Sequence, residues 1–512
     1  MNVYTLFLNR ARAWPARVAL VHEGRPMRYD ELARSAGRTA RALAAQGLRP
    51  GDRVALLSEN RAEYVQLLLG AAALGVIVAC QNWRQSPTEL RHCITLVRPQ
   101  LVICSARFAP LLADARVDAL VNGEVPVLNL DQGHEAWLQQ GQRAGDVPLG
   151  QADAEAGLFI LYTSGTTGLP KGALISHRAS MARACIAALD QLLVPGDAFI
   201  AWTPMFHMLA TDSTLTTLLG GGTVFILDGL DLPALRHLVQ TERIGHLVVI
   251  PGMVDKAIEA FSAPGFSVKG VRGVGCMADL VPPAQIEAIT RLVQAPFLNS
   301  FGATETGSAP ASAGLLAPGQ PVHDLSKRQS SLCLIRLVDD EGSEVGPDQP
   351  GEMQVSGPGL FSGYCDYQAH ADGGARLRQG DWFAMGDMFT RSADGLLHYV
   401  DRKKYLIKSG GENIYPAEIE RVLGTLPGVA DAVVIRQPDA QWGEVPVAYV
   451  VAADPALDAA TLIARCRGQI AGYKLPREVV FVRADELPRN ATGKVQRNLL
   501  EAAHARRRAG GP

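Results

Sequence analysis

Short apolar strands alternate with helices along much of this chain, and this alternation most limits the folds that it can adopt. In chain order, the predicted elements are a short hairpin over 17–22 and 26–29, a helix that Asp30 caps and that runs to Gln46, a strand at 54–58, a helix at 61–73, a strand at 76–80, a helix at 87–97 and a strand at 101–104. The alternation resumes after residue 177. Strands that alternate with helices form parallel sheets with helices on both faces. The sequence therefore predicts an α/β fold.

The chain is long enough for more than one domain, because it has 512 residues. From 332 to 401 the sequence pattern changes to short strands separated by turns, which predicts a β-rich subdomain. From 403 onward the pattern is α/β again. We expect an N-terminal domain over 1–402, built from two parallel α/β sheets and the β-rich subdomain. A small, mobile C-terminal α/β domain is expected over 403–512, with a frayed tail from residue 501.

Composition excludes several classes of partner. The net charge of −2 gives no argument for binding nucleic acid or an anionic membrane surface. The longest uncharged run, 64–83, contains glycine and amide residues and is typical of a buried helix followed by a strand, so no integral membrane segment is expected. The eight cysteines form no C-x-x-C pair and match no zinc spacing, which indicates reduced thiols and a cytoplasmic location.

The stretch 158–177, LFILYTSGTTGLPKGALISH, carries the strongest chemical signal. An apolar strand leads into a loop of glycines and hydroxyls, and a lysine follows. Glycines let backbone N–H groups approach an anion closely, and the hydroxyls and the lysine add donors and positive charge. The spacing differs from that of a Walker A motif. The candidate polyphosphate-binding residues are Thr163, Ser164, Gly165, Thr166, Thr167, Gly168 and Lys171.

Five later clusters follow in a fixed order: 299–305, Tyr364 with 386–387, 401–408, 409–418 and 487–494. With the phosphate loop, they resemble the signature motifs of the adenylate-forming (AMP-binding) superfamily, in particular its acyl-CoA synthetase, or carboxylate–CoA ligase, branch. The resemblance covers roughly residues 10–500.

This resemblance implies roles for residues around the nucleotide. Ser300, Phe301, Gly302 and Ala303 are expected to flank the adenine, Thr304 to contact the α-phosphate, and Asp387 and Arg402 to bind the ribose. Glu305, with Thr167, is expected to hold Mg²⁺. Lys494 resembles the catalytic lysine, which bridges the attacking carboxylate and the α-phosphate.

The resemblance also implies a thiol site and an acid site. Gly410, Gly411 and Trp442 correspond to the CoA tunnel, and Lys404 to the hinge about which the C-terminal domain rotates. The expected acyl pocket contains Phe206, His207, Gly275, Cys276 and Met277, with His207 either as a gate between acid and CoA or as a core histidine. Relatives usually have Gly-Gly-Ala at 275–277, so the acyl preference stays open. Asp212 either contacts a polar substrate or caps a helix.

The sequence thus predicts an ATP-dependent, AMP-forming acyl-CoA synthetase that uses ATP, Mg²⁺ and coenzyme A. Its substrate is expected to be a medium-chain fatty or aromatic carboxylic acid. One alternative is a stand-alone adenylation enzyme that loads a carrier-protein phosphopantetheine, and another is a catalytically silent nucleotide-binding protein. A homodimer, and a lysine acetyltransferase that acts on Lys494, are further expected partners.

Overall fold

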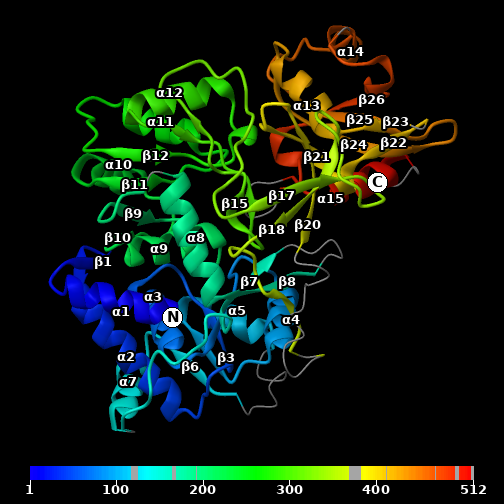
Figure 1. Cartoon of the computed structure of the whole chain (residues 1–512). Helices are drawn as coiled ribbons and strands as arrows, with labels where there is room; N and C mark the ends of the chain where they lie inside the picture. The colour runs from blue at the N-terminus through cyan, green and yellow to red at the C-terminus, as the bar shows by residue number, and fades with distance from the viewer. Residues whose placement is uncertain are drawn as a thin grey trace. The chain divides into compact units, whose positions relative to one another are not determined.

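The computed structural model describes residues 1–116, 125–143, 145–163, 169–191, 193–367, 369, 382–410, 412–467, 469–489 and 495–508 (Figure 1). The chain divides into two compact units. Unit 1 comprises Met1–Leu334 and Ser356–Phe383, and unit 2 comprises Ile335–Val355 and Ala384–Pro512. The expected domain boundary between residues 402 and 403 lies inside unit 2 and stays a prediction.

Unit 1 contains a seven-stranded sheet in the order β19-β8-β7-β4-β3-β5-β6. From β7 to β6 the neighbouring strands are parallel, as the alternation predicted. At the other edge, β7 pairs antiparallel with β8, and β8 pairs antiparallel with β19. The strands are β3 (Arg53–Leu57), β4 (Ile77–Cys80), β5 (Leu101–Cys104), β6 (Val127–Asn129), β7 (Gly157–Thr163), β8 (Lys171–Ser176) and β19 (Gly363–Cys365).

The second large sheet of unit 1 has eight strands in the order β16-β13-β12-β11-β9-β10-β1-β2. Its strands are parallel from β13 to β1, and the two edge strands, β2 and β16, pair antiparallel. The strands are β1 (Val18–His22), β2 (Arg25–Arg28), β9 (Ala198–Ala201), β10 (Val224–Ile226), β11 (Ile244–Leu247), β12 (Val271–Val274), β13 (Phe297–Leu298) and β16 (Leu315–Leu316). The expectation of two α/β sheets with parallel strands is confirmed, with antiparallel edges added.

Helices pack around these sheets (Figure 1). Every residue of α3 from Tyr64 to Leu74 is buried, so the uncharged run is a core helix that leads into β4. None of the helices in the described part of the chain is long and apolar enough to cross a membrane. The helices of unit 1 are α1 (Val3–Ala13), α2 (Tyr29–Ala45), α3 (Ala62–Leu74), α4 (Pro87–Val97), α5 (Ala109–Asp114), α7 (His134–Arg143), α8 (His177–Asp190), α9 (Met208–Leu219), α10 (Leu232–Thr241), α11 (Val254–Ser262) and α12 (Pro283–Val293).

Unit 2 contains a four-stranded sheet, β17-β18-β20-β21, and a five-stranded sheet in which β26 pairs with β25 beside the path β23-β22-β25-β24. The four-stranded sheet confirms the β-rich subdomain that was predicted over 332–401. The elements are β17 (Leu334–Val338), β18 (Gly351–Ser356), β20 (Phe383–Arg391), β21 (Leu397–Arg402), β22 (Ile407–Ser409), β23 (Glu412–Ile414), β24 (Val429–Asp439), β25 (Gly443–Ala452), β26 (Glu478–Phe481), α13 (Pro416–Thr425), α14 (Ala459–Cys466) and α15 (Arg497–Arg508).

The expected fraying of the tail from residue 501 is wrong as far as Arg508, where α15 ends. Leu500 and His504 are buried on this helix. The His504 ring lies 2.8 Å from the Tyr449 hydroxyl and 2.8 Å from Gln437 Oε1. These contacts with β24 and β25 hold a segment whose Ala/Arg-rich composition gave no sign of packing.

Candidate active site

The predicted phosphate loop connects two neighbouring antiparallel strands. Thr163 is the last residue of β7 and Lys171 the first of β8, and the two are directly opposite each other in the pairing. Both ends of the loop are therefore fixed by the same ladder. The predicted residues Ser164, Gly165, Thr166, Thr167 and Gly168 lie outside the described part of the chain.

Lys171, Tyr364 and Glu305 come together at the base of this loop. Strand β19 pairs with β8, which brings Tyr364 opposite Ala173. The Lys171 ammonium lies 5.1 Å from the centre of the Tyr364 ring, and the Tyr364 hydroxyl donates to Glu305 Oε1 at 2.5 Å. A cation, an aromatic ring and a buried carboxylate thus form one chain of contacts beside the phosphate loop.

Residues 301–310 form a tight hairpin that presents Thr304 and Glu305. Strands β14 (Gly302–Ala303) and β15 (Gly307–Pro310) pair antiparallel. A Cβ atom on Gly302 would lie 2.1 Å from the Gly307 carbonyl oxygen, so no larger residue fits there. Within the hairpin, the Ala303 N–H donates to Thr306 Oγ1 at 3.0 Å. The Phe361 N–H also donates to the Glu305 carbonyl at 2.8 Å.

The hairpin begins beside the segment predicted to form one wall of the acyl pocket. The Phe301 N–H donates to Ser312 Oγ at 3.1 Å, and Ser300 Oγ accepts from the Met277 N–H at 3.2 Å. Gly275 has a φ of 81°, and a Cβ atom there would lie 2.2 Å from the Phe297 ring. The close approach explains the glycine at this position and joins 275–277 to the end of β13.

Phe206, a predicted acyl-pocket residue, and His207, the predicted gate, immediately precede α9. The two rings lie 4.6 Å apart between centres, and Trp83 contacts the edge of Phe206 at 5.7 Å. The Met205 N–H donates to the buried Asn60 side chain at 2.8 Å. The approach to α9 is therefore held by ring packing and by a side-chain hydrogen bond from a distant part of unit 1.

In unit 2, the predicted ribose-binding residues are partners across two strands. Asp387 on β20 is directly opposite Arg402 on β21, and Arg402 Nε lies 2.8 Å from Asp387 Oδ1. The aspartate side chain is 2% exposed and the arginine side chain 41% exposed. Since the carboxylate offers two acceptors, it can bind vicinal hydroxyls while the arginine compensates its charge.

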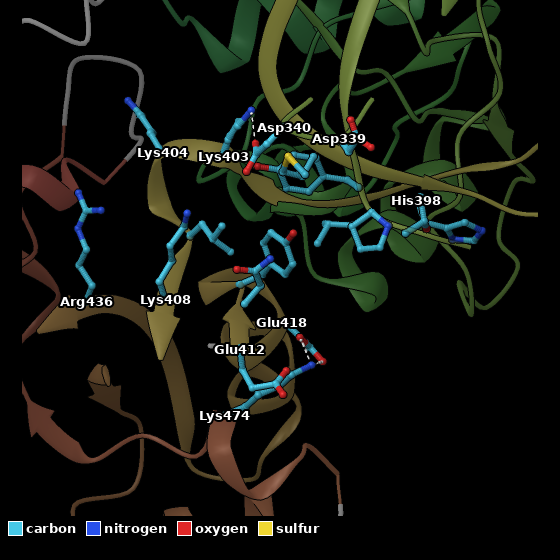
Figure 2. Close-up of a pocket in the computed structure, with 18 of the residues that line it drawn as sticks. Asp339, Asp340, His398, Lys403, Lys404, Lys408, Glu412, Glu418, Arg436 and Lys474 are labelled. Atoms are coloured by element: carbon cyan, nitrogen blue, oxygen red, sulfur yellow. Dashed lines mark hydrogen bonds and ion pairs between the residues drawn. The ribbon is translucent and has the colours of Figure 1, made fainter. Parts of the chain in front are cut away.

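Unit 2 also holds a cavity of 1140 Å³, which Figure 2 shows. The predicted hinge residue Lys404 lies on its wall. Several charges in it are paired, because Lys403 lies 2.9 Å from Asp340 and Lys474 lies 2.7 Å from Glu418.

Two of the residues predicted to form the CoA tunnel, Gly410 and Trp442, are in contact in unit 2. The Gly410 N–H donates to the Trp442 carbonyl at 2.7 Å, and a Cβ atom on Gly410 would lie 2.7 Å from the Trp442 ring. Glycine therefore allows the indole to pack against the backbone. Gly411 lies outside the described residues, as does Lys494.

The residues present in unit 1 fit a magnesium ion bound together with a nucleotide. Mg²⁺ prefers oxygen ligands and is usually held by one or two carboxylates together with phosphates and water. Glu305 is such a carboxylate, and its backbone is fixed from Phe361. The described residues contain no cluster of three or more His, Cys, Asp or Glu side chains that could hold a metal alone. The remaining magnesium ligands would therefore be groups other than the His, Cys, Asp and Glu side chains of the described residues.

Two buried charged clusters were not anticipated. Lys327, whose side chain is fully buried, lies 2.6 Å from Asp279 and donates to the Asn299 side chain, so it joins the residues just after the predicted pocket residue Met277 to the start of the 299–305 cluster. Arg183 on α8 forms an ion pair with Asp212 at 3.1 Å. Asp212 lies within α9, so of the two alternatives for this residue the helix cap is wrong. A lone basic residue gives no sequence signal of such contacts.

Comparison with known proteins gives matches to two family models along the chain. The model of the AMP-binding enzyme family matches residues 7–365, and that of the AMP-binding enzyme C-terminal domain matches residues 418–494. The chain is 35% identical to an indoleacetate–CoA ligase of Aromatoleum aromaticum over 503 residues, which is 96% of each protein. It is 33% identical to a feruloyl-CoA synthase of Amycolatopsis, over 95% of this chain and 96% of that enzyme.

A solved structure agrees with these matches. The o-succinylbenzoate CoA synthetase of Bacillus subtilis, in complex with ATP and a magnesium ion, superimposes with a TM-score of 0.82 at 27% identity, covering 97% of this chain and 98% of that one. The chain belongs to the AMP-binding enzyme family.

Proposed function

We propose that the protein is an AMP-forming acyl-CoA synthetase that activates an aromatic carboxylic acid. The chain of contacts from Lys171 through Tyr364 to Glu305 carries the first step, because it places a cation and a carboxylate at the base of the phosphate loop. Indoleacetate and ferulate, named for two relatives, are both aromatic acids, and both relatives are named for CoA products. This favours an aryl acid over a medium-chain fatty acid, and free CoA over a carrier protein.

In the first step, the substrate carboxylate attacks the α-phosphorus of ATP, and the bond to pyrophosphate breaks. Lys171 and the loop hydroxyls hold the β- and γ-phosphates as negative charge builds on the leaving group. Glu305 and Thr167 would hold Mg²⁺, which would supply positive charge near the phosphates. Lys494 bridges the carboxylate and the α-phosphate, and Asp387 with Arg402 holds the ribose.

In the second step, the CoA thiolate attacks the acyl carbon, a thioester bond forms, and AMP departs with the electron pair of the broken bond. Gly410, Gly411 and Trp442 guide the thiol arm, and His207 gates its entry. Rotation about Lys404 exchanges the Lys494 segment for the Gly410–Gly411 turn between the steps. No side-chain nucleophile is required, since binding brings the reactants together.

The test is release of pyrophosphate against a panel of acids, with and without CoA. Indoleacetate, ferulate, 2-succinylbenzoate and octanoate cover the aromatic and aliphatic choices. Release that depends on one aromatic acid, with a thioester formed only when CoA is added, supports the proposal. An adenylate that reacts only with a carrier protein would support the first alternative, and no release with any acid would support a silent nucleotide binder.

Two lysine variants with a matched control sharpen this test. Lys171→Met and Lys494→Ala are expected to abolish most of the release, because the first removes a positive charge that holds the departing pyrophosphate and the second removes one beside the α-phosphate. Lys269→Met removes an exposed lysine of unit 1 that pairs with Glu242 at 3.8 Å, and it should leave the rate unchanged. Equal loss in all three variants would contradict the assigned roles.

Three expectations about the wider context remain part of this proposal. A homodimer would be seen as a doubled mass in light scattering. Acetylation of Lys494 would remove its charge and so block the first step, which mass spectrometry and activity of the acetylated enzyme would reveal. A cytoplasmic location would be tested by fractionation of the source cells.

A further inference from the structure

Arg183 is a buried arginine that contacts three separate segments of unit 1. Its side chain is 2% exposed. Nε donates to the Gly359 carbonyl at 2.9 Å, one terminal nitrogen donates to Asp212 Oδ2 at 3.1 Å, and the other donates to the Thr304 carbonyl at 3.0 Å. The planar guanidinium directs its donors along fixed lines, so these bonds set the relative positions of the three segments.

The buried cation needs a partner, and Asp212 supplies it. The Asp212 side chain is 12% exposed. Burial raises the pKa of this carboxyl, while the charge of Arg183 opposes that shift. A guanidinium so deeply buried is tolerated when a carboxylate and further acceptors satisfy its donors. Asp212 lies on α9, which begins directly after the predicted gate residue His207.

The backbone around Arg183 is shaped to admit it. Gly307 has a φ of 72°, and a Cβ atom there would lie 2.7 Å from Arg183 Cδ. On the other side, a Cβ atom on Gly359 would lie 3.7 Å from Arg183 Cγ. The arginine stem therefore packs against glycines in the two segments that flank Glu305.

The same arrangement fixes two successive carbonyl groups at the predicted site. Arg183 holds the Thr304 carbonyl, and the Phe361 N–H holds the Glu305 carbonyl at 2.8 Å. Phe361 follows Gly359, which Arg183 also holds. The backbone of the Thr304–Glu305 pair is thus restrained from both sides, although Arg183 itself makes none of the contacts expected for substrate.

We propose that Arg183, with Asp212 as its counter-ion, is a positioning residue for adenylation that holds Thr304 and Glu305 where they receive ATP with its magnesium. The inference rests on the proposed function for the roles of Thr304 and Glu305. It assigns a task to a residue of α8 that no motif marks.

The first test is the binding of ATP with and without Mg²⁺, measured by calorimetry on the full-length wild type and Arg183→Lys. Lysine keeps the positive charge for Asp212 but lacks the fork that reaches Thr304 and Gly359. We expect the gain in ATP affinity that Mg²⁺ confers to fall by about 10- to 100-fold, as is typical when a partner that orients a metal ligand is lost. ATP binding without Mg²⁺ should change little. An unchanged magnesium effect would overturn the proposal.

The second test separates the two half-reactions. Arg183→Lys should slow acid-dependent pyrophosphate release by about 100-fold, since small displacements of reacting groups have effects of this size. Thioester formation from synthetic acyl-adenylate and CoA should stay close to wild type. Wild type that binds ATP with magnesium but turns over no acid would refute the proposed function alone, because the calorimetric test of Arg183 stands without turnover.

Arg53→Lys is the matched control. Arg53 also lies in unit 1, its side chain is 14% exposed, and it donates to the carbonyls of Gly51, Val97 and Arg98 at 3.2, 3.1 and 3.0 Å. It should lower the melting temperature but leave the magnesium effect and the ratio of half-reactions unchanged. Equal changes in the Arg53 and Arg183 variants would mean that Arg183 acts on stability alone and would overturn the proposal.

Three further variants complete the design. Asp212→Asn keeps an acceptor for Arg183 and leaves its bonds to Thr304 and Gly359, so the magnesium effect should be largely retained. If Asp212→Asn lost as much of the magnesium effect as Arg183→Lys, the assignment of Asp212 as merely the counter-ion of Arg183 would be contradicted. Should Arg183→Lys fail to fold, Arg183→Gln compared with Arg53→Gln gives the same measurement with a neutral side chain at each position.

Discussion

His177 makes the stability of unit 1 depend on pH in a way that can be calculated. It is the first residue of α8, its side chain is fully buried, and its Nδ1 accepts from the Val3 N–H at 3.3 Å. Burial, aided by the positive charge at the chain's amino terminus, lowers the pKa of His177 to about 4 from 6.5. The ring is therefore neutral in the folded protein at every pH well above 4.

The sign of the effect follows from the lowered pKa. As the pH falls below 6.5, the unfolded chain takes up a proton at His177 before the folded protein does. The stabilisation is fully present above pH 6.5 and is lost as the pH falls toward 4. The shift from 6.5 to about 4 corresponds to about 3 kcal/mol in total. About 2 kcal/mol of this is expected to be lost between pH 7 and pH 5.

Urea unfolding at pH 7 and pH 5, followed by tryptophan fluorescence, measures this loss. Other groups titrate over the same range, so the informative quantity is the difference between wild type and His177→Asn, whose amide oxygen can still accept from Val3. The variant should be less sensitive to pH by about 2 kcal/mol. His237→Asn, at an exposed histidine of α10, should behave as wild type. Equal sensitivity in wild type and His177→Asn would refute the reasoning.

Three other substitutions test other parts of the structure. Tyr364→Phe removes the hydroxyl that donates to Glu305 at 2.5 Å, and it should raise the magnesium concentration for half-maximal pyrophosphate release by about tenfold. An unchanged magnesium requirement would argue that Glu305 does not bind the metal. Asp387→Asn loses the charge paired with Arg402 and should raise KM for ATP by about tenfold without changing KM for the acid; equal changes in both constants would argue against a ribose contact. Gly424→Ala, on α13 where a Cβ atom meets nothing within 4 Å, should stabilise the protein by about 0.5 kcal/mol in thermal unfolding, and a lower melting temperature would contradict the open geometry.

The fold was predictable from the sequence where local periodicity determined it. The central parallel strands of both large sheets follow from short apolar runs separated by helices, because such runs are buried on both faces. The pairing of β19 with β8 could not be predicted, since 363–365 and 172–174 are far apart in the chain. Helix α1 was missed although Asn2 caps it and accepts from the Thr5 N–H at 3.0 Å, a signal that the sequence does contain.

The residues of the candidate site were likewise predictable where a local motif marks them and not where only tertiary packing brings them together. Lys171 and Glu305 were predicted because each lies in a motif whose residue types suit phosphate and magnesium chemistry. The hydrogen bond from the Tyr364 hydroxyl to Glu305 was not predicted, because a contact between residues 59 positions apart depends on how strands pair. Arg183 and Lys327 gave no local signal, since a single basic residue is usually solvated and only tertiary packing buries it.

The division of the chain into two units bears on how a rotation could occur. The backbone passes between the units after Leu334, after Val355 and after Phe383, so three covalent connections join them. Moving the whole of unit 2 as one body would require three segments to bend together. A pivot at Lys404 lies within unit 2, beyond the last of these crossings, and needs only one connection to turn. Rotation at that single point would carry residues 405–508, which include α13 to α15, while the sheet of β17, β18, β20 and β21 keeps its three covalent connections to unit 1.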